Sequence, residues 1–357
     1  MVRSMKRVCL AIVILAGSLS ACNEELRYLL QQAPGQIAIL LHRDKIAKIL
    51  EDPNLDPEAR RKLELVLDVK GYAEDRIGLV HNQNYSVYTK IDREAVVYTL
   101  SACPPLSFQA KTWKFPVVGE APYLGFFKKA DGEKKKARLE AEGYDVYLRP
   151  AGAYSMLGIA SDPIYSPLLK LNDAELANLV VHELSHATIW VPGQVEFNES
   201  VALFIGNQGS LEYLVQRFGA DADPVRYALG ANEDDKTFSV FLRGLYRELD
   251  QLYQSDLSDA GKLKRKAEII AAARQNFRDQ ILPSMQTDDY RRFPESVINN
   301  ASILQRKLYY KDVSLYYRVF DAHHQDLRAT VDFFKEIAKP GGDVEAAVRQ
   351  WLDQHQP

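Results

Sequence analysis

The segment from Asn172 to His186 most constrains the fold, because it has to form a helix that presents two histidines on one face. Asn172 and Glu175 have the spacing of a capping box at a helix start. Leucines and valines then recur at intervals of three and four residues, as on the buried face of an amphipathic helix. Residues four apart on a helix differ by about 40° around its axis, so His182 and His186 point the same way. The segment therefore predicts a capped, half-buried helix that ends before Pro192.

The two histidines belong to an H-E-x-x-H motif that suits one zinc ion. Two imidazoles on one helical face can bind Zn²⁺ at about 2.0–2.1 Å, and Glu183 can hold a water at the open position and take its proton. With 7 histidines in 357 residues, a chance H-E-x-x-H motif is expected on the order of 0.01 times per chain. The alternative is a core helix whose polar residues are satisfied by their neighbours.

A catalytic zinc site needs three protein ligands and an open position. Pro192-Gly193 predicts the end of the histidine helix, and Asn198 is expected to cap a second helix, with Glu199 in its first turn. Two antiparallel helices joined by a short loop can bring Glu199 opposite the histidines. Glu196 is the competing ligand, and complementing the helix dipole is the alternative role for Glu199. The predicted ligands of one Zn²⁺ per chain are His182, His186 and Glu199.

The first residues predict a leader that is not part of the fold. Three basic residues precede an apolar run that is too short to span a bilayer comfortably, as in a signal peptide. The run ends in L-S-A-C at 19–22, which resembles the lipobox of bacterial lipoproteins. We predict a signal peptide over 1–21 and a lipid on Cys22; a plain secretory signal is the alternative. Since Asn23 rather than Asp follows, we expect the periplasmic face of the outer membrane in a diderm bacterium.

Composition excludes several classes of protein. The chain has 45 Lys+Arg against 48 Asp+Glu, so it has no basic footprint for nucleic acid, which we do not expect as a partner. Hydrophobic residues make up 46% of the chain, enough to fill a core. The chain has only 3 cysteines, which cannot form a disulfide scaffold. Cys103 is expected to be a small buried residue.

The rest of the sequence predicts an α+β fold that is predominantly helical. Residues 24–52 and 57–78 have helical spacing, with Pro34-Gly35 expected to interrupt or kink the first helix and Asp56 to cap the second. Residues 84–128 and 143–148 are rich in strand formers and predict a small sheet.

From residue 172 onward the chain is mostly helical, with a charged helix over 258–280. The basic run 128–138 predicts a solvated helix face. The predicted parts, which together form one compact unit after residue 21, are a helical hairpin over 22–80, a mixed β-sheet subdomain over 81–170 and a helical half with the zinc site over 171–357.

The residues around the motif resemble a known family. H-E-L-S-H-A-T at 182–188, followed by F-N-E-S-V-A at 197–202, is similar to the zinc-dependent gluzincin peptidases, and more narrowly to the bacterial family described as predicted aminopeptidases. Further blocks that look like this family lie at 111–117, 143–150, 153–158 and 299–301. The resemblance implies a zincin-like fold with a small sheet beside the motif helix and hydrolysis of peptide or protein substrates. It implies Glu183 as the base and His182, His186 and Glu199 as the ligands.

Two positions depart from the related patterns. The chain reads Gly158-Ile159-Ala160 where Gly-Trp-Phe is expected. It has Leu203 where thermolysin-like enzymes carry an Asp that supports a histidine ligand, so another acceptor has to serve here.

A further donor is expected to stabilise the oxyanion. The candidates for this role or for binding substrate backbone are Tyr309, Tyr310, Tyr316, Tyr317, His323, His324, Asn299 and Asn300. The alternatives are core positions for the aromatic residues and a helix cap for the asparagines. Two other functions stay open: a catalytically silent zinc-binding or scaffold lipoprotein, and a structural envelope protein with incidental histidines.

Overall fold

The computed structural model describes residues 24–115, 119–151, 161–309, 313–339 and 341–355. The predicted lipidation site Cys22, the candidate Tyr310 and the departure at 158–160 lie outside these described residues. The fold is α+β and 64% helical with small sheets, as the sequence predicted. None of the described helices is long and apolar enough to span a bilayer.

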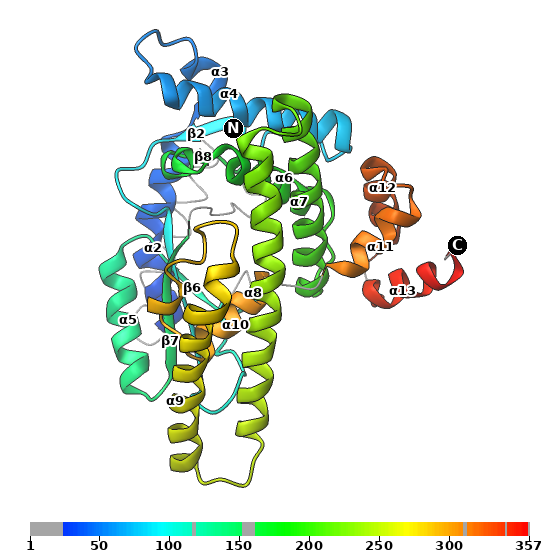
Figure 1. Cartoon of the computed structure of the whole chain (residues 1–357). Helices are drawn as coiled ribbons and strands as arrows, with labels where there is room; N and C mark the ends of the chain where they lie inside the picture. The colour runs from blue at the N-terminus through cyan, green and yellow to red at the C-terminus, as the bar shows by residue number, and fades with distance from the viewer. Residues whose placement is uncertain (1–23, 116–118, 152–160, 310–312, 340, 356–357) are drawn as a thin grey trace.

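Helices dominate both ends of the chain (Figure 1). The α-helices are α2 (Glu24–Leu41), α3 (Ile46–Ile49), α4 (Pro57–Tyr72), α5 (Lys129–Ala141), α6 (Asp173–Thr188), α7 (Val195–Phe218), α8 (Asp223–Tyr253), α9 (Asp259–Asn276), α10 (Asn300–Tyr309), α11 (Ser314–Ala322), α12 (Leu327–Ile337) and α13 (Val344–Gln354). Short π or 3₁₀ turns are η1 (Ala73–Ile77), η2 (Ser166–Lys170), η3 (Phe277–Ile281), η4 (Leu282–Ser284) and η5 (Phe293–Glu295). The predicted charged helix is α9, and the predicted solvated basic helix is α5.

The predicted sheet region forms three small sheets rather than one. The strands are β1 (Asp44–Lys45), β2 (Val87–Thr89), β3 (Val97–Cys103), β4 (Trp113–Phe115), β5 (Gly119–Ala121), β6 (Leu124–Phe126), β7 (Asp145–Ala151) and β8 (Ile164–Tyr165). In the largest sheet β3 lies between β6 and β7 and is antiparallel to both, with Leu100 opposite Leu124 and Leu148. β3 ends at Cys103, which is a buried free thiol, as predicted, and burial raises its pKa to about 12.

Two of the three predicted helix caps, at Asp56 and Asn172, are confirmed by their hydrogen bonds. The Asp56 carboxylate accepts from the Ala59 N–H at 2.9 Å and caps α4. Asn172 and Glu175 form a reciprocal capping box at the start of α6, with both side-chain-to-backbone distances at 2.9 Å. Such caps satisfy N–H groups that have no partner inside the helix.

α2 is not interrupted at Pro34, which lies inside the helix. A Cβ added to Gly35 would overlap the ring of Phe127. The missing side chain therefore lets α2 approach the end of β6. The helix ends at Leu41 rather than extending to 52, because the chain then forms β1 and pairs with β2.

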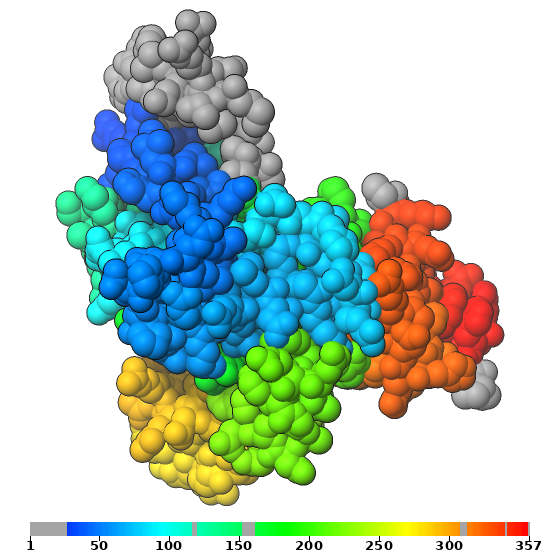
Figure 2. Space-filling model, turned by 90° about the horizontal axis from the view of Figure 1, so that it is seen from above, coloured from blue at the N-terminus to red at the C-terminus, as the bar shows by residue number. Residues whose placement is uncertain are grey.

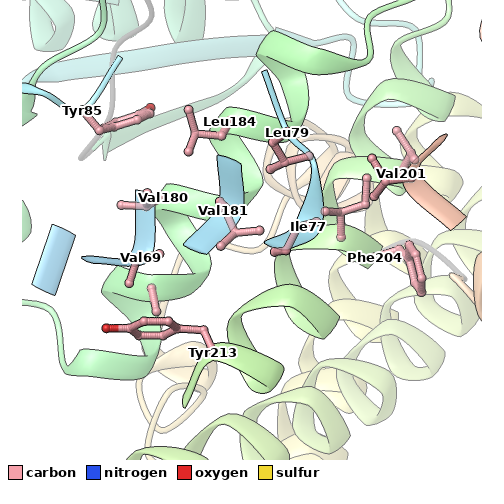
Figure 3. Packing of buried hydrophobic residues seen from close by; sticks show 14 of the residues in the cluster. Val69, Ile77, Leu79, Tyr85, Val180, Val181, Leu184, Val201, Phe204 and Tyr213 are labelled. Atoms are coloured by element: carbon pink, nitrogen blue, oxygen red, sulfur yellow. The ribbon is translucent and has the colours of Figure 1, made fainter. Parts of the chain in front are cut away.

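The core is centred on α6 and α7, and its largest buried cluster takes members from residue 39 to residue 352. Val181 and Leu184 of α6 lie against Ile77 and Leu79, which follow α4 (Figure 3). Val201 of α7 belongs to the same buried cluster. Each such side chain stabilises the fold by roughly 1.5–3 kcal/mol when fully buried. This packing fixes α6 between the N-terminal helices and α7.

Other helices surround this core. α8 and α9 form a long antiparallel hairpin that projects from the rest of the molecule (Figure 1). α11, α12 and α13 form a lobe on one side, and α4 with the segment after it covers one end of the molecule (Figure 2). α11 and α12 both contact α7.

A buried ion pair connects α4 to the start of α6. Lys62, whose side chain is 5% exposed, contacts Asp173 at 2.6 Å and donates to the Leu171 carbonyl at 2.6 Å. Arg61 adds a second contact to Asp173 at 2.7 Å. Burial alone would raise the pKa of Asp173, but the hydrogen bonds from Arg61 and Lys62 outweigh it and lower the pKa.

Replacing Asp173 by Asn should lower the free energy of unfolding at pH 7 by about 2–3 kcal/mol, because Lys62 would stay buried without its counter-charge. The lowered pKa means that this stabilisation is full above the unfolded-state value of about 3.9 and is lost as pH falls through the folded-state pKa. Urea unfolding from pH 7 down to about pH 2, which passes through both pKa values, would measure both effects. Asp223→Asn is the control, since that carboxylate is 91% exposed and should matter little. An equal effect of the two variants would contradict the prediction.

Candidate metal centre

Three predicted ligands converge between α6 and α7. The Nε2 atoms of His182 and His186 lie 3.2 Å apart. The Glu199 carboxylate is 3.7 Å from His186 Nε2 and 4.0 Å from His182 Nε2. One ligand atom from each residue fits within 4.8 Å of the others, and in the described part of the chain no other three His, Cys, Asp or Glu residues make such a group.

The donor set fits a tetrahedral zinc ion. Two ligand nitrogens at about 2.0–2.1 Å from zinc in tetrahedral geometry are separated by about 3.3 Å, close to the observed 3.2 Å. Two imidazoles and one carboxylate also match the His₂Glu ligand set found in zinc peptidases. The set leaves a fourth position free for water or substrate.

Burial keeps both histidines in the form that binds metals. It lowers the pKa of His182 to about 3, with a further contribution from His186. It also lowers the pKa of His186 to about 4. Both rings are therefore neutral at physiological pH, and a neutral imidazole offers a lone pair to a cation.

The backbone supplies a support for one histidine that the sequence did not identify. The His182 ring hydrogen-bonds to the backbone carbonyl of Ala202 in α7. A partner of this kind orients a ligand ring and fixes its tautomer. His186 Nδ1 is buried and has no hydrogen-bond partner among the described residues, while its ring packs edge-on against Trp190 at 5.7 Å. Among the described residues, no carboxylate therefore supports either histidine in the way expected of the Asp at the position of Leu203 in thermolysin-like enzymes.

Glu183 lies in a partly buried, negatively charged environment. Burial raises its pKa to about 7, and the charges of Glu199 and Asp162 add to the shift. A carboxyl with a pKa near 7 can both accept and release a proton near neutral pH. This is the property required of a general base that later acts as an acid.

Two neighbours of Glu183 were missed by the sequence analysis. Tyr85 is 3% exposed and has a left-handed φ of 59°. Its N–H donates to the Asp162 carbonyl at 2.7 Å, and both Tyr85 and Asp162 interact electrostatically with Glu183. Strained backbone of this kind is enriched at functional sites. No spacing in the sequence marks these residues, because they approach Glu183 only through the tertiary fold.

The predicted cap at Asn198 is wrong. α7 begins at Val195, so Asn198 lies inside the helix and Glu199 lies beyond its first turn. The fully buried Asn198 amide instead accepts from the Val191 N–H at 2.8 Å and donates to the Val191 carbonyl at 2.9 Å. An amide one turn into a helix can satisfy the preceding loop instead of the helix end. Glu196 is exposed and is not a member of the metal group.

Two glycines let α7 pack closely on α6. A Cβ on Gly206 would lie 3.1 Å from the His182 Cβ, and one on Gly209 would meet the side chains of Ile77 and Val181. The backbones of the two helices therefore approach each other beside the first histidine. The Asn178 amide also donates to Asn207 Oδ1 at 2.8 Å across the same interface.

The asparagines that were candidates for substrate binding have partners in the protein. Asn299 Oδ1 accepts from the Ser302 N–H at 2.9 Å, which fits the helix-cap alternative at the start of α10. Asn300 is fully buried, and its amide donates to three backbone carbonyls between residues 104 and 107 while accepting from Tyr253. Tyr309 ends α10, and its side chain is not described.

The remaining candidates lie in aromatic packing. Tyr316 is 1% exposed and packs against Phe204 and Phe334, and Tyr317 packs edge-on against Phe204. The His323 ring stacks on Trp351 of α13. The neighbouring His324 has a left-handed φ of 55° at the turn after α11. The contacts of Tyr316 and Tyr317 match the core alternative for the aromatic residues.

A cavity of about 340 Å³ opens along one side of the metal group. His182, Glu183 and Glu199 are among its lining residues, and the rest of the wall comes from α6, α7, α8 and Asp289. Its other lining residues are Ala174, Glu175, Asn178, Leu179, Leu203, Asn207, Ser210, Tyr227, Ala228, Ala231, Asn232 and Asp235. The site therefore has room for part of a small substrate.

Replacing Gly206 by Ala should weaken metal binding about tenfold, because the new methyl group would displace His182 from its supported position. Competition with a chromogenic zinc chelator would measure the affinity. Gly244→Ala is the matched control, since Gly244 lies inside α8 and a Cβ there meets no atom within 4 Å. Unchanged affinity in Gly206→Ala would show that the close approach does not position the ligand.

Comparison with known proteins identifies the family of the chain. The family model described as "Putative aminopeptidase" matches residues 27–348, which include all of the site. No curated protein and no solved structure gives a significant match. Because the match covers most of the sequence, the chain belongs to this aminopeptidase family.

Proposed function

We propose that the chain is a zinc-dependent peptidase, and specifically an aminopeptidase, anchored in the bacterial cell envelope. The observation that carries the proposal is the convergence of His182, His186 and Glu199, with Glu183 beside them, next to a cavity. Membership of the aminopeptidase family supports peptides as the substrates. The site chemistry also matches the gluzincin pattern of two histidines and a glutamate.

In this proposal each residue has a defined role. His182, His186 and Glu199 would hold the ion, which when bound supplies Lewis acidity to a carbonyl oxygen and makes a water more acidic. Glu183 accepts the proton of the attacking water and delivers it to the leaving amine. The Ala202 carbonyl holds the His182 ring in place. Burial of Glu183 suits it to both proton transfers near pH 7.

Glu183→Gln should retain about one zinc per chain and lose peptidase activity by a factor of roughly 10²–10⁴, because the amide cannot take the proton. His186→Ala should lose the zinc as well, since one ligand is removed. Elemental analysis and a peptide-library digest of the full-length protein would measure both.

Glu196→Gln is the control for this experiment, because it removes an exposed charge from the same helix as Glu199. Zinc binding without turnover in the wild type would instead favour the silent scaffold protein. Absence of zinc from the wild type and from every variant, after zinc is supplied and excess is washed away, would reject both the peptidase and the silent zinc-binding protein.

We also propose that Cys22 carries the lipid anchor and that the protein faces the periplasm from the outer membrane. The basis is the L-S-A-C sequence at 19–22. Cys22→Ser should move the protein from the membrane fraction to the soluble fraction, because the residue that accepts the lipid is removed. Cell fractionation with and without the substitution tests this, and Cys103→Ser is the matched control. Membrane association that survives Cys22→Ser would reject the anchor.

A further inference from the structure

The cavity beside the metal group has a strongly one-sided charge. Beyond Glu183 and Glu199 its wall carries Glu175, Asp235 and Asp289, and none of the lining residues in the described part of the chain is Lys or Arg. The first carboxylate comes from α6, the second from α8, and the third from the segment between η4 and η5. Three separate segments thus bring negative charge to one space.

These three carboxylates are too dispersed to form a second metal site. Among the described residues, the only group that can share one ion is that of His182, His186 and Glu199. The Glu175 carboxylate accepts a hydrogen bond from the Asn172 N–H. Asp289 accepts from the Tyr227 hydroxyl at 2.7 Å, and Asp235 accepts from the Tyr290 hydroxyl. The carboxylates are thus held on the wall by fixed partners, and the space between them is the cavity.

The length of the cavity along α6 decides which positive group of a bound peptide can reach its far carboxylate. Glu175 precedes His182 by seven residues, which is about 10 Å along the helix axis. In a peptide whose scissile carbonyl lies at the metal group, the α-amino group of the same residue is only about 3–4 Å away. A lysine side chain carries its ammonium roughly 6 Å from its Cα on a four-carbon stem, and arginine reaches further. A lysine or arginine side chain therefore spans the distance from the metal group towards Glu175 better than the α-amino group does.

We propose that this cavity binds the side chain of a lysine or arginine residue on the amino side of the scissile bond. The proposal rests on the proposed peptidase function and adds a substrate class to it. Leu179, Leu203, Ala228 and Ala231 supply apolar wall for the methylene stem, and the carboxylates of Glu175, Asp235 and Asp289 surround the charged end. An acidic side chain or a carboxyl terminus at this position would be repelled.

Binding to zinc-loaded, full-length Glu183→Gln protein tests the proposal without any turnover. We expect lysyl-alanyl-alanine to bind about tenfold more tightly than norleucyl-alanyl-alanine, which has a similar apolar stem and no charge. Isothermal calorimetry gives both dissociation constants. Equal affinities for the two peptides would overturn the proposal.

Two further substitutions in the Glu183→Gln protein test which carboxylates recognise the lysine ammonium. Glu175→Gln keeps the capping box, in which Gln serves as well as Glu, and Asp235→Asn keeps an acceptor for Tyr290. Together they should reduce the lysine preference to less than about threefold. Glu196→Gln, which removes a charge outside the cavity, should leave the preference unchanged. A preference that survives the double substitution would place the recognition elsewhere and overturn the proposal.

Acetylating the peptide α-amine separates the two possible cationic groups. The preference for lysine over norleucine should persist in the acetylated pair, because the side chain carries it. If acetylation alone removes binding while lysine and norleucine peptides bind equally, the cavity recognises the amino terminus and the proposal fails. Cleavage by the wild type without lysine preference would reject this inference alone, whereas lysine-selective binding without cleavage would reject only the peptidase function.

Discussion

The close packing of α6 on α7 is the constraint on which the site depends. Gly206 lies against His182 and adds no side chain of its own at this contact, and Val181 and Leu184 of α6 lie in the buried core. Interiors packed this densely transmit even small changes of volume. The separation of the two histidines from Glu199 is therefore fixed by apolar contacts that take no part in the chemistry.

The same burial that stabilises the fold also sets the charge state of the site. Removing His182 and His186 from water favours their neutral forms, and removing Glu183 from water favours its protonated form. The carboxyl group is thus kept near the point where it can exchange a proton, while the imidazoles are kept ready to bind a cation. Burial therefore raises the pKa of the proposed base, Glu183, and lowers the pKa values of the two proposed histidine ligands.

Features that depend on neighbouring residues were predictable from the sequence. The caps at Asp56 and Asn172 follow from side-chain-to-backbone bonds over three residues, and the shared face of His182 and His186 follows from helical geometry. The predicted cap at Asn198 failed because the sequence cannot tell whether an amide bonds forward into its helix or back to a loop. Tyr85 and the acidic wall from Asp289 could not be predicted, because only the tertiary fold brings them to the motif.

The Asn198 amide, which clamps the loop at Val191, has a consequence for how the site is assembled. All three members of the metal group lie within 18 residues of sequence, from 182 to 199, and the clamp closes the turn between their two helices. Contacts of such short range form with little loss of loop entropy. The metal group is therefore a local module of the chain, whereas α8 and the segment around Asp289 reach it over long sequence separations. Selection can therefore alter the distant wall, and under the proposed function the choice of substrate, while the local metal group stays unchanged.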